Sequence, residues 1–83
     1  MIENRHLIHL TELSSGEKGT VIQINNGRMV NNRLVSLGFT PGVQVGMTRN
    51  YGHGPLIVTV RGTQIALGRG EASKIEVQRN TDD

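Results

Sequence analysis

Short runs of aliphatic and β-branched residues, separated by glycines, constrain the fold of this chain more than any other feature of its sequence. In the runs at 43–48 and 56–61, apolar side chains recur at every second position, which is the period of a β-strand with one buried face. Eleven glycines lie scattered among such runs and indicate many turns. The pattern therefore predicts a mainly β fold that forms a small, partly open barrel.

One α-helix is expected within this β-rich chain, over about residues 27–37. Val30, Leu34 and Leu37 recur there at the spacing of one helical face. Asn26 can cap the first turn, because its side-chain oxygen can accept from a free backbone N–H. The expected strands lie at 19–25, 43–48, 56–61, 64–67 and 75–77. About five strands with a single helix after the first predict an SH3-like barrel.

The expected exit from this helix contains two backbone signals. Gly38 suits the left-handed position that follows a helix, and Phe39 would then fold back over Leu34. The segment Thr-Pro-Gly-Val at 40–43 fits a type II turn, since proline presets φ at the second position and glycine permits positive φ at the third. The chain is therefore expected to reverse sharply after the helix.

Three further connections are expected in the second half of the chain. Residues 50–55 contain two glycines and a proline and are expected to form a flexible loop. Gly62 and Thr63 are expected at the centre of a type II′ hairpin turn, with glycine first. A kink at 68–70 is expected to precede one helical turn at most, over residues 71–74.

The length and composition of the chain limit the size of its core. Its 83 residues are the length of one domain, and we expect a single domain over 1–83 with a core at about 10–77 and flexible ends. Aromatic residues make up 2% of the chain, and the only rings are those of Phe39 and Tyr51. The core is therefore expected to be small and aliphatic.

The location of the protein is indicated by what its sequence lacks. The chain contains no cysteine, which excludes disulfides, thiolate metal sites and cysteine catalysis. Small secreted domains often depend on disulfides, so a cytoplasmic location is expected. No apolar segment resembles a signal peptide or approaches the roughly 20 residues that span a bilayer. We therefore expect no direct insertion into a membrane.

No pattern in the sequence predicts catalysis or a bound cofactor. His6 and His9 lie near the N-terminal end, and His53 lies far from them in a glycine-rich loop, so we expect no metal site. No phosphate-binding loop, paired carboxylates or nucleophile–base set is present. The net charge of +2 comes from basic residues spread singly, so we expect no nucleic acid among the partners. Among these classes of function, only protein binding is left. We therefore expect a non-enzymatic protein without cofactors.

The helix exit is the expected surface for a protein partner. Residues beside the apolar helical face would frame an apolar patch there, with core packing as the alternative role for the same residues. The candidate partner-binding residues are Arg33, Ser36, Leu37, Phe39 and Pro41 at the helix exit, with Tyr51 in the loop as a further candidate. The two rings are too few for the aromatic groove with which SH3 domains recognise proline motifs.

The sequence also resembles a known family along most of its length. The residues that carry the resemblance are Arg33-Leu34 with Leu37-Gly38-Phe39-Thr40-Pro41-Gly42 and Val45; Arg61-Gly62 with Ile65-Ala66-Leu67, Glu71-Ala72, Ile75 and Val77; and Leu10, Leu13, Gly16-Glu17, Gly19 and Val21. In this order and spacing they resemble the signature of the FeoA family over about residues 10–77.

The resemblance implies a cytoplasmic, SH3-like accessory protein of bacterial ferrous iron uptake. Such a protein would act on the cytoplasmic part of FeoB, a membrane iron transporter with a GTPase domain. Because no iron ligands are expected, its role would depend on protein–protein contact, with the protein a monomer or a weak homo-oligomer. Two alternatives remain open: a free-standing SH3-like domain of the metal-dependent repressor type, and a small nucleic-acid-associated barrel.

Overall fold

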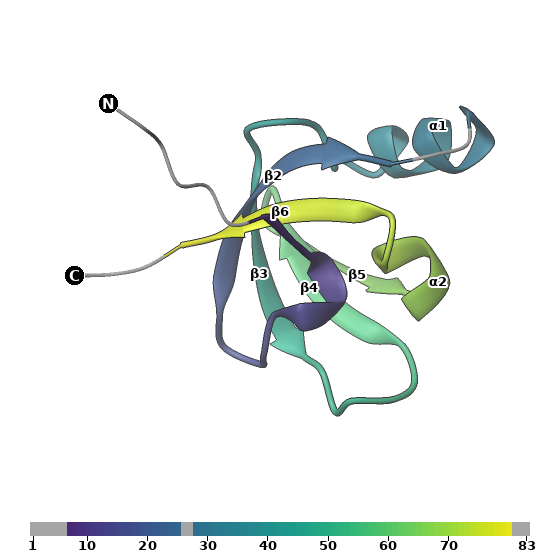
Figure 1. Ribbon diagram of the computed structural model, residues 1–83. Coiled ribbons are helices and arrows are strands. Elements are labelled where there is room, and N and C mark those ends of the chain that lie inside the picture. Colours follow the sequence, from purple (N-terminus) through teal and green to yellow (C-terminus); the bar gives the residue numbers. More distant parts are fainter. Residues whose placement is uncertain (1–6, 26–27, 81–83) are drawn as a thin grey trace.

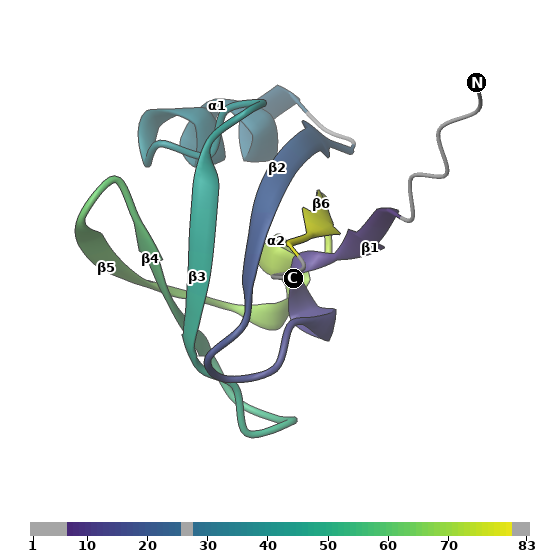
Figure 2. The same cartoon turned by 90° about the vertical axis from the view of Figure 1, so that its left-hand side faces the viewer.

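The computed structural model describes residues 7–25 and 28–80, with the backbone alone described at 28–31. The described strands form one antiparallel sheet of six strands in the order β1-β6-β2-β3-β4-β5. Their bounds are β1 (Leu7–His9), β2 (Lys18–Ile24), β3 (Gln44–Arg49), β4 (Leu56–Val60), β5 (Thr63–Leu67) and β6 (Ile75–Arg79). Three helical segments accompany them: η1 (Leu10–Glu12), α1 (Arg28–Ser36) and α2 (Arg69–Ala72). The sheet is strongly curved, and α1 lies at one end of it (Figures 1 and 2).

This architecture confirms the predicted mainly β, SH3-like open fold, with two differences in its elements. The first is the strand β1, which lies where the sequence indicated a flexible end and pairs with β6 through Ile8 and Val77. A described strand of three residues, Leu7–His9, is too short to give a strand signal of its own. The second is α2, which begins at Arg69, two residues before the expected helical turn, and buries Ala72.

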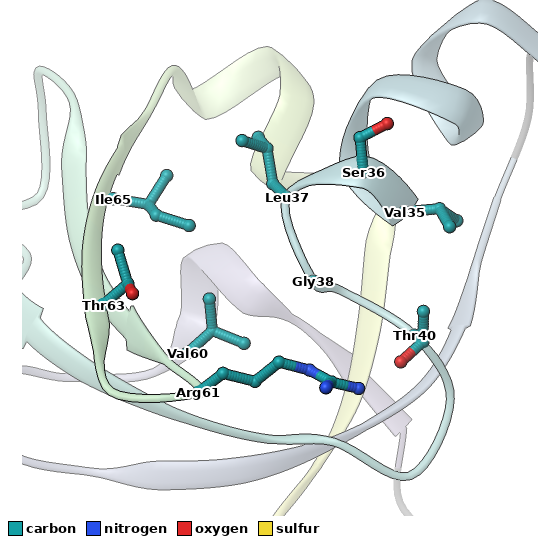
Figure 3. A pocket seen from close by; sticks show the side chains of 9 residues that line it. All are labelled: Val35, Ser36, Leu37, Gly38, Thr40, Val60, Arg61, Thr63 and Ile65. Carbon is teal, nitrogen blue, oxygen red and sulfur yellow. The ribbon is translucent and has the colours of Figure 1, made fainter.

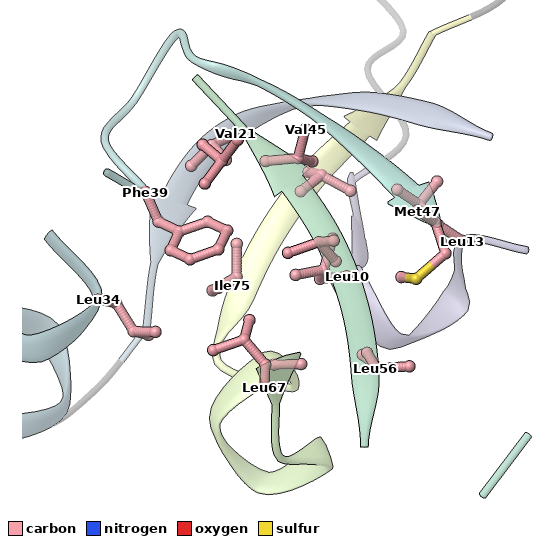
Figure 4. Close-up of a cluster of buried hydrophobic side chains, with 14 residues drawn as sticks. Leu10, Leu13, Val21, Leu34, Phe39, Val45, Met47, Leu56, Leu67 and Ile75 are labelled. Atoms are coloured by element: carbon pink, nitrogen blue, oxygen red, sulfur yellow. The ribbon is translucent and has the colours of Figure 1, made fainter. Parts of the chain in front are cut away.

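The core consists of aliphatic side chains and one aromatic ring, that of Phe39, which lies on the α1 side of the cluster (Figure 4). Among the described residues, no polar or charged side chain is fully buried. The buried side chains are Leu10, Leu13, Val21, Leu34, Phe39, Val45, Met47, Leu56, Val58, Val60, Leu67, Ala72, Ile75 and Val77. They come from every described strand except β1 and from η1, α1 and α2. Because α1 contributes Leu34 to this cluster, the core fixes α1 against the sheet.

The exit from α1 has the geometry that its sequence predicts. Gly38 has a φ of +107°, its N–H donates to the carbonyl of Val35 at 2.9 Å, and the N–H of Phe39 donates to the carbonyl of Leu34 at 3.0 Å. These two bonds are those of a Schellman motif, and Leu34 and Phe39 are both buried. The predicted helix start at 26–27 lies outside the described residues.

We expect Gly38→Ala to lower the free energy of unfolding by about 1 kcal/mol or more, because an L-residue resists this positive φ. A Cβ at this position would stand 3.4 Å from the Cδ of Arg61, an ordinary contact, so the cost comes from the backbone. Gly70→Ala is the matched control, because Gly70 has neither a positive φ nor a neighbour within 4 Å of its Cβ position. Urea denaturation measures the stability of both variants. Equal denaturation midpoints for Gly38→Ala and Gly70→Ala would contradict the prediction.

The two predicted turns have different outcomes. The type II turn at 40–43 is confirmed, since Gly42 has a φ of +92° and the N–H of Val43 donates to the carbonyl of Thr40 at 3.0 Å. The predicted type II′ turn at Gly62-Thr63 is wrong by one residue. Val60 pairs with Thr63, so the central residues are Arg61 and Gly62, with φ values of +52° and +80°. Positive φ at both positions defines a type I′ turn, in which arginine is unusual.

Candidate protein-binding site

An open groove of about 490 Å³ lies between the C-terminal end of α1 and the β4–β5 hairpin (Figure 3). It is built from two segments that are distant in sequence, the exit of α1 and the hairpin. The residues that line it are Val35, Ser36, Leu37, Gly38, Thr40, Val60, Arg61, Thr63 and Ile65. We define this set of residues as the α1–hairpin groove.

The walls of the α1–hairpin groove carry aliphatic side chains that are only partly covered. Leu37 and Ile65 are half-buried against the core from opposite sides of the groove, and Val35 is 42% exposed. Single exposed hydrophobic residues are common on protein surfaces, but a group of them beside a concave surface is typical of a contact site. The α1–hairpin groove can therefore accept apolar side chains from another molecule.

Arg61 provides the positive charge of the α1–hairpin groove. Its side chain passes close to Gly38 and extends toward Thr40 (Figure 3). Within residues 7–25 and 28–80, its guanidinium has no hydrogen-bond or ion-pair partner. The exposed guanidinium can therefore donate to a carboxylate of another molecule.

A second arginine, Arg33, lies on α1 outside the groove and is engaged within the protein. Its Nε donates to Oε2 of Glu71 in α2, and this hydrogen bond, followed by the charge of the carboxylate, raises the pKa of Arg33. The Arg33 side chain remains 58% exposed. It therefore links α1 to α2 and still presents part of its guanidinium to solvent.

The predicted partner-binding residues do not form one surface. Ser36 and Leu37 line the α1–hairpin groove, and Pro41 is exposed in the nearby turn. Phe39 is fully buried, so it supports this region from inside the core. Tyr51 is 69% exposed and lies in the loop after β3, at the opposite end of the molecule from α1 (Figure 2).

The loop at the far end is held by hydrogen bonds, although its glycines and proline indicated flexibility. The side-chain amide of Asn50 donates to the carbonyls of Thr11 and Leu13, at 3.1 and 2.7 Å. The Nε of Arg69 donates to the carbonyl of Gly54 at 2.9 Å. Both contacts join segments that are far apart in sequence, so the local sequence pattern could not reveal them.

The local sequence did not indicate the hairpin side of the groove. Arg61 and Ile65 belong to the sequence pattern that resembles a known family, but the hairpin was interpreted only as two strands and a turn. The positive φ of Arg61 appears only in the structure, and it is the feature that distinguishes this turn from an ordinary one. The approach of the hairpin to Val35 and Leu37 is likewise a tertiary contact.

No group of three or more His, Cys, Asp or Glu side chains that could hold a metal ion occurs among the described residues. Within the same part of the chain, no helix is both long and apolar enough to cross a membrane.

A family model and a curated relative identify the family of this chain. The model of the FeoA domain matches residues 8–79. A protein of Methanocaldococcus jannaschii whose name connects it with Fe(2+) transport is 41% identical over 63 residues, which are 76% of each chain.

Two solved structures resemble the fold closely. One is an iron uptake regulatory protein, FeoA, with 33% identity, a TM-score of 0.86, and coverage of 90% of this chain and 100% of that chain. The other is FeoA of Stenotrophomonas maltophilia in complex with zinc, described as a prokaryotic SH3 domain protein. It has 30% identity and a TM-score of 0.77, with coverage of 86% of this chain and 89% of that chain.

Proposed function

This chain belongs to the FeoA family, and on that premise we propose that it is a non-enzymatic, cytoplasmic accessory protein of ferrous iron uptake that acts by binding the cytoplasmic, GTPase-containing part of a FeoB-like membrane transporter. The membership itself connects the chain with Fe(2+) transport and with an SH3-like fold. The partner and the manner of contact are the proposed part.

The α1–hairpin groove is the observation that carries this proposal. It combines partly exposed aliphatic walls, formed by Val35, Leu37 and Ile65, with the charge of Arg61, which has no partner among the described residues. Protein interfaces commonly place apolar contacts at their centre and charged groups at their rim, and arginine is enriched in them. The groove therefore suits a protein partner better than it suits a small molecule, which would need a more enclosed pocket.

In this proposal iron is the cargo of the transporter, and this protein acts on the transporter by protein–protein contact.

The test is a calorimetric titration of the full-length FeoB-like transporter, reconstituted in nanodiscs, with this protein. We expect the wild type to bind. Arg33→Glu should bind about fivefold more weakly, because it reverses an exposed charge beside the groove. A wild type that shows no binding would overturn the proposed function.

A charge swap separates contact with the partner from the internal pair. Arg33→Glu alone places a second carboxylate beside Glu71, so it also disturbs the link between α1 and α2. The double variant Arg33→Glu/Glu71→Arg restores an ion pair in which the two charges have exchanged positions. If Arg33 contacts the partner, the double variant still binds weakly; recovery of wild-type affinity would mean that the ion pair, and not contact with the partner, accounts for the loss.

A further inference from the structure

The strand β5 is an edge strand without the features that normally protect such an edge. It ends the sheet beside β4, and its residues Thr63–Leu67 include no charge and no proline. Its pairing with β4 continues without a bulge, whereas the β2–β6 and β3–β4 pairings each contain one. The opposite edge, β1, has three described residues, Leu7–His9. Charges, prolines and bulges are the usual means of blocking an edge, so β5 remains open to another strand.

The turn before β5 determines which backbone groups are free. In a two-residue hairpin the flanking residues, here Val60 and Thr63, form a hydrogen-bonded pair, and such pairs then alternate along the strands. The N–H and C=O groups of Gln64 and Ala66 therefore point away from β4. Within the described part of the chain nothing bonds to them, and both residues are exposed.

Arg61 adds a charge at the start of this edge, in a conformation that arginine does not favour. Its φ of +52° lies in the left-handed region, where asparagine or glycine would fit a type I′ turn with less strain. The side chain gains no partner among the described residues in return. Strain that the fold does not use is an indication of function.

The α1–hairpin groove lies on the face of β5 that carries Thr63 and Ile65, with Leu37 on the opposite wall. Side chains on one face of neighbouring strands lie next to each other. A strand added beside β5 would therefore direct every second side chain toward Ile65 and Leu37, which favours apolar residues at those positions.

We propose that β5 binds an extended segment of the partner protein by strand addition, with alternate apolar side chains of the segment at the α1–hairpin groove and a carboxylate of the segment at Arg61. The backbone of Gln64 and Ala66 provides the hydrogen bonds, as in other complexes formed by strand addition. The proposal rests on the proposed function for the source of the segment, the cytoplasmic part of the transporter.

A second copy of this chain fits the edge less well than an acidic segment does. Its own β5, Thr63–Leu67, carries no charged residue, so antiparallel pairing of two β5 strands would supply no carboxylate from either strand to Arg61. An acidic segment of the partner supplies one.

Amide hydrogen exchange provides a direct test in the complex with the nanodisc-reconstituted transporter. In the free protein the amides of Gln64 and Ala66 should exchange faster than those of Thr63, Ile65 and Leu67, which bond to β4. On binding, exchange at Gln64 and Ala66 should slow at least tenfold. After exchange in the complex is quenched, the complex is dissociated. NMR of this protein, which carries the isotope label, then measures the exchange at each amide.

Variants of the edge provide a second measurement. Ala66→Pro removes only the outward N–H and should weaken binding about fivefold, whereas Ala66→Thr keeps this N–H and should bind within twofold of the wild type. Arg61→Asn should weaken binding several-fold with an unchanged or higher melting temperature, because asparagine suits the turn. If Ala66→Pro fails to fold, Arg61→Asn and the exchange data still test whether a strand is added to β5.

The outcomes separate the two proposals. A wild type that does not bind the transporter overturns the proposed function and the strand addition together. Binding that is unaffected by Ala66→Pro and Arg61→Asn, without slowed exchange at Gln64 and Ala66, overturns strand addition alone. Slowed exchange that depends on protein concentration in the absence of the transporter assigns the edge to a second copy and also overturns the proposal.

Discussion

Replacing Phe39 with alanine is expected to lower the free energy of unfolding by about 3–5 kcal/mol, the usual cost of deleting a buried aromatic ring. Phe39 is fully buried, it is the one ring in the described core, and its backbone N–H closes the Schellman motif of α1 through the carbonyl of Leu34. For a chain of 83 residues, a total stability of ~4–12 kcal/mol is typical, so this variant approaches the limit of folding.

Urea denaturation followed by circular dichroism measures this effect. Phe39→Leu is the matched control, because it keeps an apolar side chain and should cost less, about 1–2 kcal/mol. A Phe39→Ala protein with wild-type stability and reduced binding to the transporter would contradict the buried position and would make Phe39 a direct contact. The expected result is the reverse, with any lost binding recovered at temperatures or ligand concentrations at which the variant is folded.

Local chemistry explains why the exit of α1 could be predicted from the sequence. The left-handed position of Gly38 and the type II turn at 40–43 depend on the conformational limits of glycine and proline, which act within a few residues. The fold-back of Phe39 over Leu34 follows from the same motif. The mainly β class likewise follows from short alternating runs that each carry their own signal.

The features that could not be predicted depend on contacts between distant segments. The strand β1 is defined by its pairing with β6, about 70 residues away in sequence, and its own residues carry almost no strand signal. The hairpin register was missed because arginine in a left-handed conformation is rare, so Gly62 was placed first in the turn instead of second.

The candidate site shows the same limit. The sequence indicated the helix side of the groove through Ser36 and Leu37, but not the hairpin side, because only the folded sheet brings Ile65 across from Leu37. The pairing of Arg33 with Glu71 joins residues 38 positions apart and could not be read from local spacing. Phe39 was placed both in the core and at the surface, and the structure describes it only in the core.

Val35→Gln is expected to weaken binding to the FeoB-like transporter at least tenfold, or about 1.4 kcal/mol, with little change in stability. Val35 is 42% exposed on the last turn of α1, so its replacement removes little packing. Glutamine has a slightly better helix propensity than valine and brings no charge. In a complex, however, its amide would lie against an apolar partner surface, and a buried amide without a hydrogen-bond partner costs ~1–3 kcal/mol.

Tyr51→Gln is the matched control, since it also replaces an exposed hydrophobic side chain with the same polar residue. Tyr51 is 69% exposed and lies at the end of the molecule opposite α1, where its ring stacks 5.7 Å from the guanidinium carbon of Arg49. If the α1–hairpin groove is the interface, calorimetric titration should show the loss for Val35→Gln and wild-type affinity for Tyr51→Gln. The opposite pattern would place the interface at the loop after β3. Melting temperatures of both variants are measured as well, and values that match the wild type exclude unfolding as the cause of any lost binding.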